Sequence, residues 1–245
     1  MNISLIVLSI AVPMLVVERL YPGTARVSRK LWWPRALASI GAQAGIVFIA
    51  ASTWDQWLSH YSILPSHNLG TALGAVIGYL TITFIFYWWH RARHEVPFLW
   101  RTLHQIHHSP ARLELLTTFY KHPTEIVCNS FLSALVLSVF LGLTPTAASV
   151  AMIVAGIAEL FYHWNIRTPR WLGYFIQRPE SHRIHHQFGY HRNNYSDLPL
   201  WDILFGTFEN PHASKIVCGF THERELMIWS MLIGRNCNNT IQFRF

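Results

Sequence analysis

Five apolar runs dominate the hydrophobicity pattern of the chain, and shorter polar segments separate them. Each run has about the length of a helix that crosses the hydrocarbon core of a bilayer, and each carries few charges. A backbone in lipid must satisfy its own hydrogen bonds, which favours helices. The pattern therefore predicts an all-α, integral membrane helical bundle of about five spanning helices, over residues 2–18, 36–58, 69–89, 124–142 and 145–164.

The basic residues are confined to some of the polar segments. All 19 Lys and Arg residues lie outside 36–90 and 122–166. Basic residues collected in alternate loops follow the positive-inside rule. We therefore expect the N-terminus outside the membrane, and segments 90–123 and 165–212 together with the C-terminus on the cytoplasmic side. The net charge of +7 would otherwise suggest nucleic acid as a partner. Membrane topology explains the basic residues better, so no nucleic acid partner is expected.

The whole chain, 1–245, is predicted to form a single membrane domain. The first run has neither the basic start nor the small-residue cleavage site of a signal peptide, so we expect it to be a retained span. In the C-terminal tail, 213–245, the apolar centre of 223–235 is too short to span a bilayer and could lie in its interface as an amphipathic helix. The three cysteines form no CxxC pair. Nothing indicates the oligomeric state.

Histidines supply the candidate chemistry. The runs HRARH, HQIHH and HRIHH all fall in the predicted cytoplasmic segments, which together form a helical cap. Helix positions i, i+3 and i+4 share one face, so each HxxHH run can aim three imidazoles at one point and HxxxH can aim two. Imidazole is the commonest metal-binding side chain. The candidate ligands are His90, His94, His104, His107, His108, His182, His185 and His186.

Two further histidines extend this set. His163 closes the fifth predicted span, and His122 directly precedes the fourth. Ten imidazoles exceed the four ligands of a structural zinc and suffice for two metals with open positions. An all-nitrogen shell suits iron, copper, nickel or zinc. The sequence therefore predicts a His-rich di-metal site in the cap. His191 lies off the helical spacing of its cluster and is not counted.

Two carboxylates are candidates for orienting the ligands. Glu159 lies one helical turn before His163, and a carboxylate there either supports a ligating imidazole or simply reaches the aqueous face. Asp202 is either a similar acceptor or the cap of a turn before Gly206. Asn165 is interpreted as a cap at the end of the fifth span.

The sequence resembles the fatty acid hydroxylase and sterol desaturase superfamily of membrane histidine-box proteins. The resemblance covers about residues 70–210. The motifs that carry it are YWWHRARHEVPFLWRTLHQIHHSP, KHPTE, FYHWN, HRIHH and NNYSDLPLWDILFGTF. The segment Gly189-Tyr-His191-Arg and the polar end of the tail depart from the family pattern.

The resemblance implies a non-haem di-iron oxygenase that hydroxylates or desaturates a lipid, such as a sterol or a fatty acyl chain. Such an enzyme uses two iron ions, dioxygen as co-substrate, a lipid substrate from the bilayer, and electrons from a separate donor protein at the cytoplasmic face. Zinc could replace iron in purified protein. The ten histidines would be the metal ligands. A metal-binding membrane protein without turnover and a metal transporter remain alternatives, and nothing separates hydroxylation from desaturation.

Overall fold

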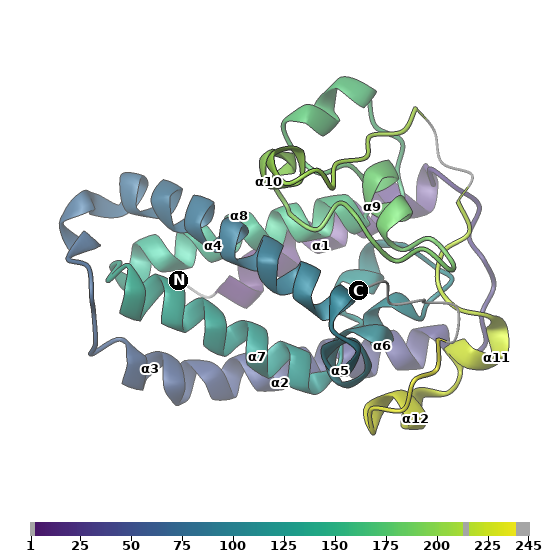
Figure 1. Ribbon diagram of the computed structural model, residues 1–245, viewed down its shortest axis with the longest axis horizontal. Helices are drawn as coiled ribbons and strands as arrows, with labels where there is room; N and C mark the ends of the chain where they lie inside the picture. The colour runs from purple at the N-terminus through teal and green to yellow at the C-terminus, as the bar shows by residue number, and fades with distance from the viewer. Residues whose placement is uncertain (1–2, 213–215, 239–245) are drawn as a thin grey trace.

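A computed structural model describes residues 3–212 and 216–238, and this part of the chain is all-helical, as predicted (Figure 1). The long helices are α1 (Ile3–Leu20), α2 (Trp32–Ser52), α4 (Gly70–Glu95), α7 (Pro123–Ala134) and α8 (Pro145–His163). The short ones are α3 (Trp54–Leu58), η1 (Ser66–Leu69), α5 (Pro97–Leu99), η2 (Trp100–His104), α6 (Gln105–His108), η3 (Leu115–Phe119), η4 (Leu135–Phe140), η5 (Arg170–Tyr174), α9 (Pro179–His185), α10 (Pro199–Leu204), α11 (His222–Glu225) and α12 (Ile228–Leu232).

Four helical segments of the described residues are long and apolar enough to cross a membrane. They are Trp32–Leu58, Ser66–Glu95, Pro123–Phe140 and Pro145–His163, and they correspond to the last four predicted spans. The run predicted as the first span, 2–18, forms α1, apart from residue 2, which lies outside the described residues. That α1 also crosses the membrane stays a prediction.

The bundle has an apolar interior and an apolar exterior. Where α4, η4 and the start of α8 meet, Ile82, Leu137 and Ala147 form part of a buried cluster. On the outer side of α2, Phe48 is 76% exposed and Ile49 is 52% exposed. An apolar outer surface of this kind is suited to acyl chains rather than to water.

At the end of the bundle far from the histidines, two turns pack against each other. The predicted turn from Gly142 to Pro145 joins η4 to α8, and Thr144 caps α8 by accepting a hydrogen bond from the amide of Ala147. Gly142 has φ +62°, and a Cβ atom added there would lie 2.1 Å from the carbonyl oxygen of Leu64. Only glycine fits this turn without strain.

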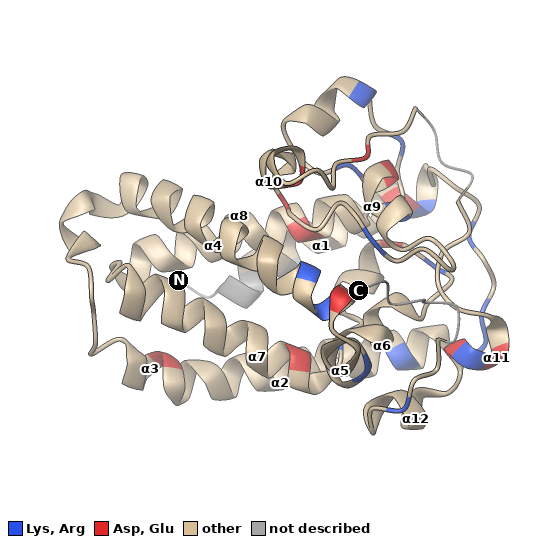
Figure 2. Cartoon of the chain, viewed as in Figure 1, with Lys and Arg blue, Asp and Glu red and all other residues tan. Residues whose placement is uncertain are grey.

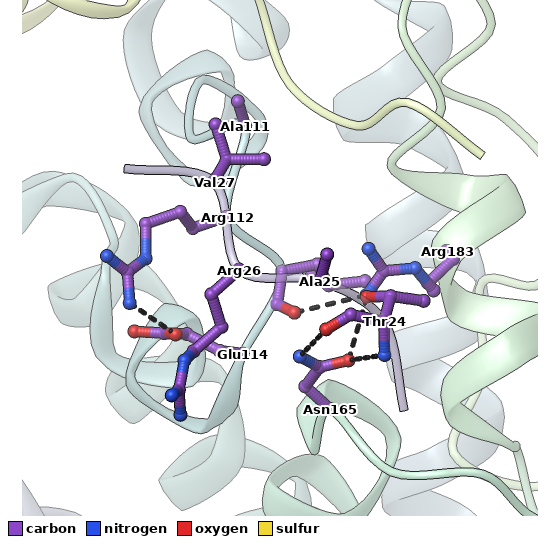
Figure 3. Close-up of a pocket in the computed structure, with 10 residues that line it drawn as sticks. Thr24, Ala25, Arg26, Val27, Ala111, Arg112, Glu114, Asn165 and Arg183 are labelled. Atoms are coloured by element: carbon purple, nitrogen blue, oxygen red, sulfur yellow. Dashed lines mark hydrogen bonds and ion pairs between the residues drawn. The ribbon is translucent and has the colours of Figure 1, made fainter. Parts of the chain in front are cut away.

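The other end of the bundle carries the cap. Segments that follow α4 and α8 in the sequence return across this end as η2, α6 and α9 (Figure 1). Lys and Arg residues gather there, whereas the far half of the bundle shows none among the described residues (Figure 2). One cavity on this side, lined in part by Thr24, Arg112, Asn165 and Arg183, has a volume of about 10 Å³ (Figure 3). It has room for about one water molecule.

The N-terminal loop is tied to the cap through Asn165. Its side-chain oxygen accepts hydrogen bonds from the amide and hydroxyl of Thr24, and its amide nitrogen donates to the carbonyl of Thr24. Asn165 therefore pins the loop after α1, and its interpretation as the cap of α8 is corrected, because Trp164 is the capping residue of that helix.

The tail closes over the HQIHH segment. Gln105 donates to the carbonyl of Arg235 at 2.8 Å and accepts from the amide of Cys237 at 3.1 Å. The stretch predicted as one amphipathic helix, 223–235, forms two short helices that break at Met227. Trp229 on the outer side is 83% exposed, and Met231 on the inner side is fully buried. Residues 213–215 and 239–245 of the predicted tail lie outside the described residues.

We expect Gly142→Ala to lower the free energy of unfolding by more than about 1 kcal/mol, because the turn needs a left-handed residue and leaves no space for a methyl group. Thermal unfolding in detergent measures the effect. Gly45→Ala is the matched control, because a Cβ there meets no atom within 4 Å. This substitution should raise the free energy of unfolding by up to about 1 kcal/mol, because alanine favours a helix more than glycine does. Equal melting temperatures for the two variants would contradict this account of the turn.

Candidate metal centre

Four separate parts of the fold bring nine of the ten predicted histidines together. The last turns of α4 carry His90 and His94, and the end of α8 carries His163. The η2–α6 segment supplies the histidines of HQIHH, and α9 with the residue after it supplies those of HRIHH. All nine side chains are at most 9% exposed. Residues far apart in the sequence thus converge at the junction of the bundle and the cap.

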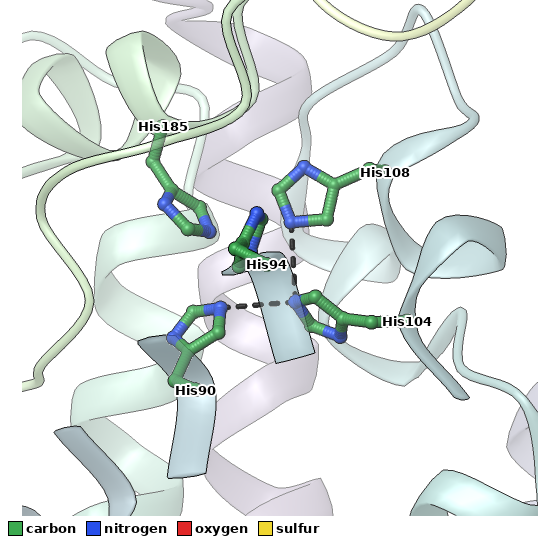
Figure 4. Close-up of side chains that lie close together, drawn as sticks. All are labelled: His90, His94, His104, His108 and His185. Carbon is green, nitrogen blue, oxygen red and sulfur yellow. Dashed lines mark hydrogen bonds between the residues drawn. The ribbon is translucent and has the colours of Figure 1, made fainter. Parts of the chain in front are cut away.

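The nine histidines form two groups. The first group is His90, His94, His104, His108 and His185 (Figure 4). The second group is His107, His163, His182 and His186. In each group, one ring nitrogen per residue lies within 4.8 Å of all the others. The groups adjoin: the rings of His108 and His186 stack with centroids 4.0 Å apart. This is the arrangement of two neighbouring metal sites.

Each HxxHH run divides its histidines between the two groups, which corrects the expectation that all three aim at one point. In HQIHH, His104 and His108 join the first group and His107 joins the second. In HRIHH the division is reversed, because His185 alone joins the first group. Neighbouring residues project about 100° apart around a helix axis. Positions i+3 and i+4 therefore diverge enough to reach two adjacent points.

The protonation state of the rings follows from their outer partners. A carbonyl oxygen can only accept a hydrogen bond, so a ring whose Nδ1 contacts one must carry its proton there. His90 donates in this way to the carbonyl of Tyr195 at 2.7 Å, and His185 to that of Asn193 at 2.7 Å. His107 and His163 donate to the carbonyls of Tyr120 and Glu159. In these rings Nε2 keeps its lone pair.

The inner nitrogens lie close together without protons between them. Nε2 of His90 is 2.9 Å from Nε2 of His104, and Nε2 of His107 is 3.2 Å from that of His163. Two lone pairs at such a distance repel unless a cation lies between them. For metal–nitrogen bonds of about 2.1 Å, ligands at right angles are about 3.0 Å apart. The donor set and its spacing therefore fit a bound metal ion in each group.

Burial keeps the imidazoles neutral. It lowers the pKa of the cap residues His104, His107, His108, His182 and His186 well below the usual range. It lowers the pKa of His185 to about 3. A metal binds only the unprotonated nitrogen of an imidazole, so neutral rings need not lose a proton on binding.

Glu125 is a supporting residue that sequence reasoning missed. Its carboxylate accepts from Nδ1 of His104 at 2.9 Å and pairs with Arg93, and all three side chains are buried. A carboxylate behind a ligating imidazole fixes the ring's orientation and raises its basicity. The only signal was its position, a carboxylate in the first turn of a predicted span beside the histidine runs. Gln177 was also missed. Its side-chain amide nitrogen lies 2.7 Å from Nδ1 of His182.

His122 belongs to neither group, contrary to its prediction as a ligand. Its Nδ1 accepts from the amide of Thr124 at 3.1 Å, so it caps α7. Its Nε2 donates to the carbonyl of Leu232 at 3.2 Å and thereby contacts the tail. Both ring nitrogens are occupied by backbone groups because the ring lies at the start of α7, facing the tail.

Glu159 supports a ligand through its backbone rather than through its carboxylate. His163 donates to the Glu159 carbonyl at 2.9 Å, whereas the carboxylate pairs with Lys121 at 2.6 Å. This differs from the predicted orienting role. The backbone contact arises because the two residues are four apart on one helix.

Asp202 contacts backbone amides rather than an imidazole. Its carboxylate accepts from the amides of Tyr195 and Ser196 and from the hydroxyl of Thr207. It therefore holds the loop that precedes α10 and also contacts Thr207, so its role is neither a direct contact with an imidazole nor the predicted cap of a turn before Gly206. Its influence on the histidines is indirect, through the position of the Tyr195 carbonyl that accepts from His90.

An all-helical bundle with four apolar helices and a histidine-lined junction defines a class of membrane protein with a candidate di-metal centre. Residues 75–207 match the fatty acid hydroxylase family, so the chain belongs to that family.

Several curated proteins are similar to the chain. An alkylglycerol monooxygenase from Danio rerio is 30% identical over 73% of this chain and 39% of its own length. An ornithine lipid hydroxylase from Rhizobium tropici is 29% identical over 73% of this chain and 51% of its own length. A very-long-chain aldehyde decarbonylase from Oryza sativa is 30% identical over 57% of this chain and 24% of its own length. The chain thus spans about half or less of the length of each of these relatives. No solved structure matches it.

We expect Glu125→Ala to weaken metal binding about 10–100-fold, because His104 loses the acceptor that orients it. Glu125→Gln keeps an acceptor and should lose less. Chelator competition on the purified protein measures both affinities. Glu159→Gln is the matched control: it changes the carboxylate but leaves the carbonyl that His163 contacts, so its affinity should stay within about twofold. A larger loss for Glu159→Gln than for Glu125→Ala would contradict these assignments.

We expect His122→Ala to keep the metal content of the natural protein and to lower the free energy of unfolding by about 1 kcal/mol, because only a helix cap is lost. Metal analysis and thermal unfolding of the same preparation separate the two effects. Loss of one metal ion per chain would show instead that His122 is a ligand.

Proposed function

We propose that the protein is a membrane-bound non-haem di-iron oxygenase that hydroxylates or desaturates a lipid. The observation that supports this most directly is the pair of adjoining histidine groups, whose ring nitrogens face one another. Each group would hold one metal ion, with His90, His94, His104, His108 and His185 around the first and His107, His163, His182 and His186 around the second. All-nitrogen ligands suit iron. The names of the relatives, an alkylglycerol monooxygenase and an ornithine lipid hydroxylase, favour hydroxylation.

A di-iron centre, when bound, supplies the activation of dioxygen and the oxidation of a C–H bond. Hydroxylation consumes dioxygen, two electrons and two protons, and gives the alcohol and water. The chain's own residues hold the metals, exclude water and present the lipid. Nine buried histidines supply neutral ligands, and Glu125 fixes the ring of His104. The position of the groups at the inner ends of α4 and α8 would let an acyl chain reach them from the bilayer.

The orientation in the membrane is part of the same proposal. The cap, with its basic segments 90–123 and 165–212, would lie in the cytoplasm together with the C-terminus, and the N-terminus would lie outside. Basic residues favour the cytoplasmic side. The electrons would come from a separate donor protein. Arginines gathered around the cap would suit an acidic surface on that donor (Figure 2).

A metal transporter is a weaker alternative. Transport requires ionisable groups along the membrane path, and the carboxylates of the predicted spans, such as Asp55, Glu125 and Glu159, lie near span ends rather than at mid-membrane. The histidine groups lie together at one end of the helices instead.

Anaerobically purified protein should contain about two iron ions per chain. His107→Ala and His185→Ala should each abolish turnover, because each removes a ligand from a different group. Both variants should still insert into the membrane, which fractionation checks. One zinc and no iron would favour a structural site, and full turnover by either variant would remove that residue from the ligand set.

Comparison of the lipids of cells with and without the protein identifies the reaction. Hydroxylation gives a product heavier by one oxygen atom, and desaturation gives one lighter by two hydrogen atoms. Neither product should form in cells that carry His107→Ala. An unchanged lipid profile together with two bound metals would favour the non-catalytic alternative.

A further inference from the structure

The loop that follows α9 has an unusual backbone. His191, Asn193 and Asn194 have φ values of 43°, 64° and 50°. Residues other than glycine enter this left-handed region at a cost in free energy, and histidine and asparagine tolerate it best. Such backbone persists only where the surrounding contacts determine it, and it is often found at functional sites.

The same loop supplies the outer partners of the first histidine group. The ring of His191 contacts Nδ1 of His108 at 3.1 Å through its own Nδ1. Its neighbours provide the carbonyls of Asn193 and Tyr195, which accept from His185 and His90. Three of the five rings in the first group are therefore oriented by residues 191–195, which we call the orienting loop.

The second group takes its outer partners from other parts of the chain. His107 donates to the carbonyl of Tyr120, and His163 donates to that of Glu159. Gln177 contacts the ring of His182. The side-chain nitrogen of Gln177 also donates to the carbonyl of Asn194 at 3.1 Å. The orienting loop therefore holds three rings of the first group directly and reaches the second group only through Gln177.

Among the described residues, the ring of His191 has one hydrogen-bond contact, with His108. The residue is 2% exposed, and its ring packs between Trp100 and Phe220 with centroids 5.6 Å from each. Its Nε2 is buried without a hydrogen-bond partner. If His108 binds a metal through Nε2, its Nδ1 carries the proton and donates it to Nδ1 of His191. Nε2–H of His191 is then left unpaired, which a purely structural residue would avoid.

Several contacts hold the orienting loop rigid. Asp202 accepts from the amides of Tyr195 and Ser196. Asn194 donates through its side chain to the carbonyl of Ser181 and accepts from the amide of Glu209. These buried contacts offset the backbone strain and fix where the ring of His191 and the two carbonyls lie.

We propose that residues 191–195 position the ligands of the first metal site selectively, with His191 as the positioning residue for His108. The proposal rests on the two-metal centre proposed above. It also gives Asp202 a role: by holding the loop, it acts on the first site through Tyr195. A merely structural loop would affect both sites or neither.

The test is a titration of the metal-free, detergent-purified protein with cobalt(II), whose visible absorption reports each site. His90→Ala and His163→Ala assign the two binding phases to the first and second groups. His191→Phe keeps a ring between Trp100 and Phe220 but removes the acceptor. It should weaken the first phase about 10–100-fold and change the second less than about twofold. His191→Asn, which keeps an acceptor and tolerates the left-handed backbone, should restore the first phase.

Two further variants keep the result decisive. Asp202→Asn should weaken the same phase, and it serves if His191→Phe does not fold. His122→Ala should lower the melting temperature while leaving both phases unchanged. Equal weakening of both phases by His191→Phe and by Asp202→Asn, or of neither, would overturn the selective role. Binding of fewer than two cobalt ions by the natural protein would overturn the two-metal centre itself, whatever the loop does.

Discussion

The fold is organised around neutral imidazole nitrogens that face one another at about hydrogen-bond distance without a proton to share. His90 and His104 illustrate it: their Nε2 atoms are 2.9 Å apart, and each ring has an acceptor at Nδ1. Repulsion between the lone pairs would push such rings apart in a protein that held them for packing alone. A cation bound in each group would turn this repulsion into attraction. The bundle, the cap and the tail can all be understood as parts that bring these nitrogens together.

Outer hydrogen bonds carry much of this organisation, because they decide which nitrogen of each ring points inward. Most of the acceptors are backbone carbonyls, which belong to helix ends and turns rather than to side chains. The carbonyl of Glu159 reaches His163 through ordinary helix geometry, whereas the carbonyl of Tyr195 reaches His90 from a distant loop. The site therefore depends on the exact course of the backbone as much as on the ligands. For the same reason, a turn held by Asp202 would act at a distance on the proposed metal centre.

Nine of the ten predicted histidines lie together in the structure, because residue type and helical spacing can both be read from the sequence. Hydrophobic run length also predicted the helices, since a bilayer sets a minimum span. Failures came where the answer depended on tertiary geometry. His122 has the right residue type and lies close to the runs, but its ring is used to cap α7. Glu125 could not be recognised, because only the packing of α7 against α4 and η2 places it behind His104. The division of each HxxHH run between two groups could not be predicted either, because it depends on which histidines of other elements lie beside each ring.

The tail contacts both the bundle and the segment that carries the HQIHH histidines. Gln105 lies between His104 and His107 in the sequence. Its side chain binds the backbone of the tail through both its nitrogen and its oxygen. Glu225, fully buried, pairs with Arg29 and Arg35, which flank the start of α2. Removing one partner of a buried ion pair leaves an uncompensated charge and is strongly destabilising. Polar contacts therefore tie the tail to the first turn of α2 at one point and to the helical turn that carries His104 and His107 at another. These polar contacts act together with a buried apolar cluster that includes Trp100, Phe220 and Met231, so polar and apolar packing both fix the geometry of the cap.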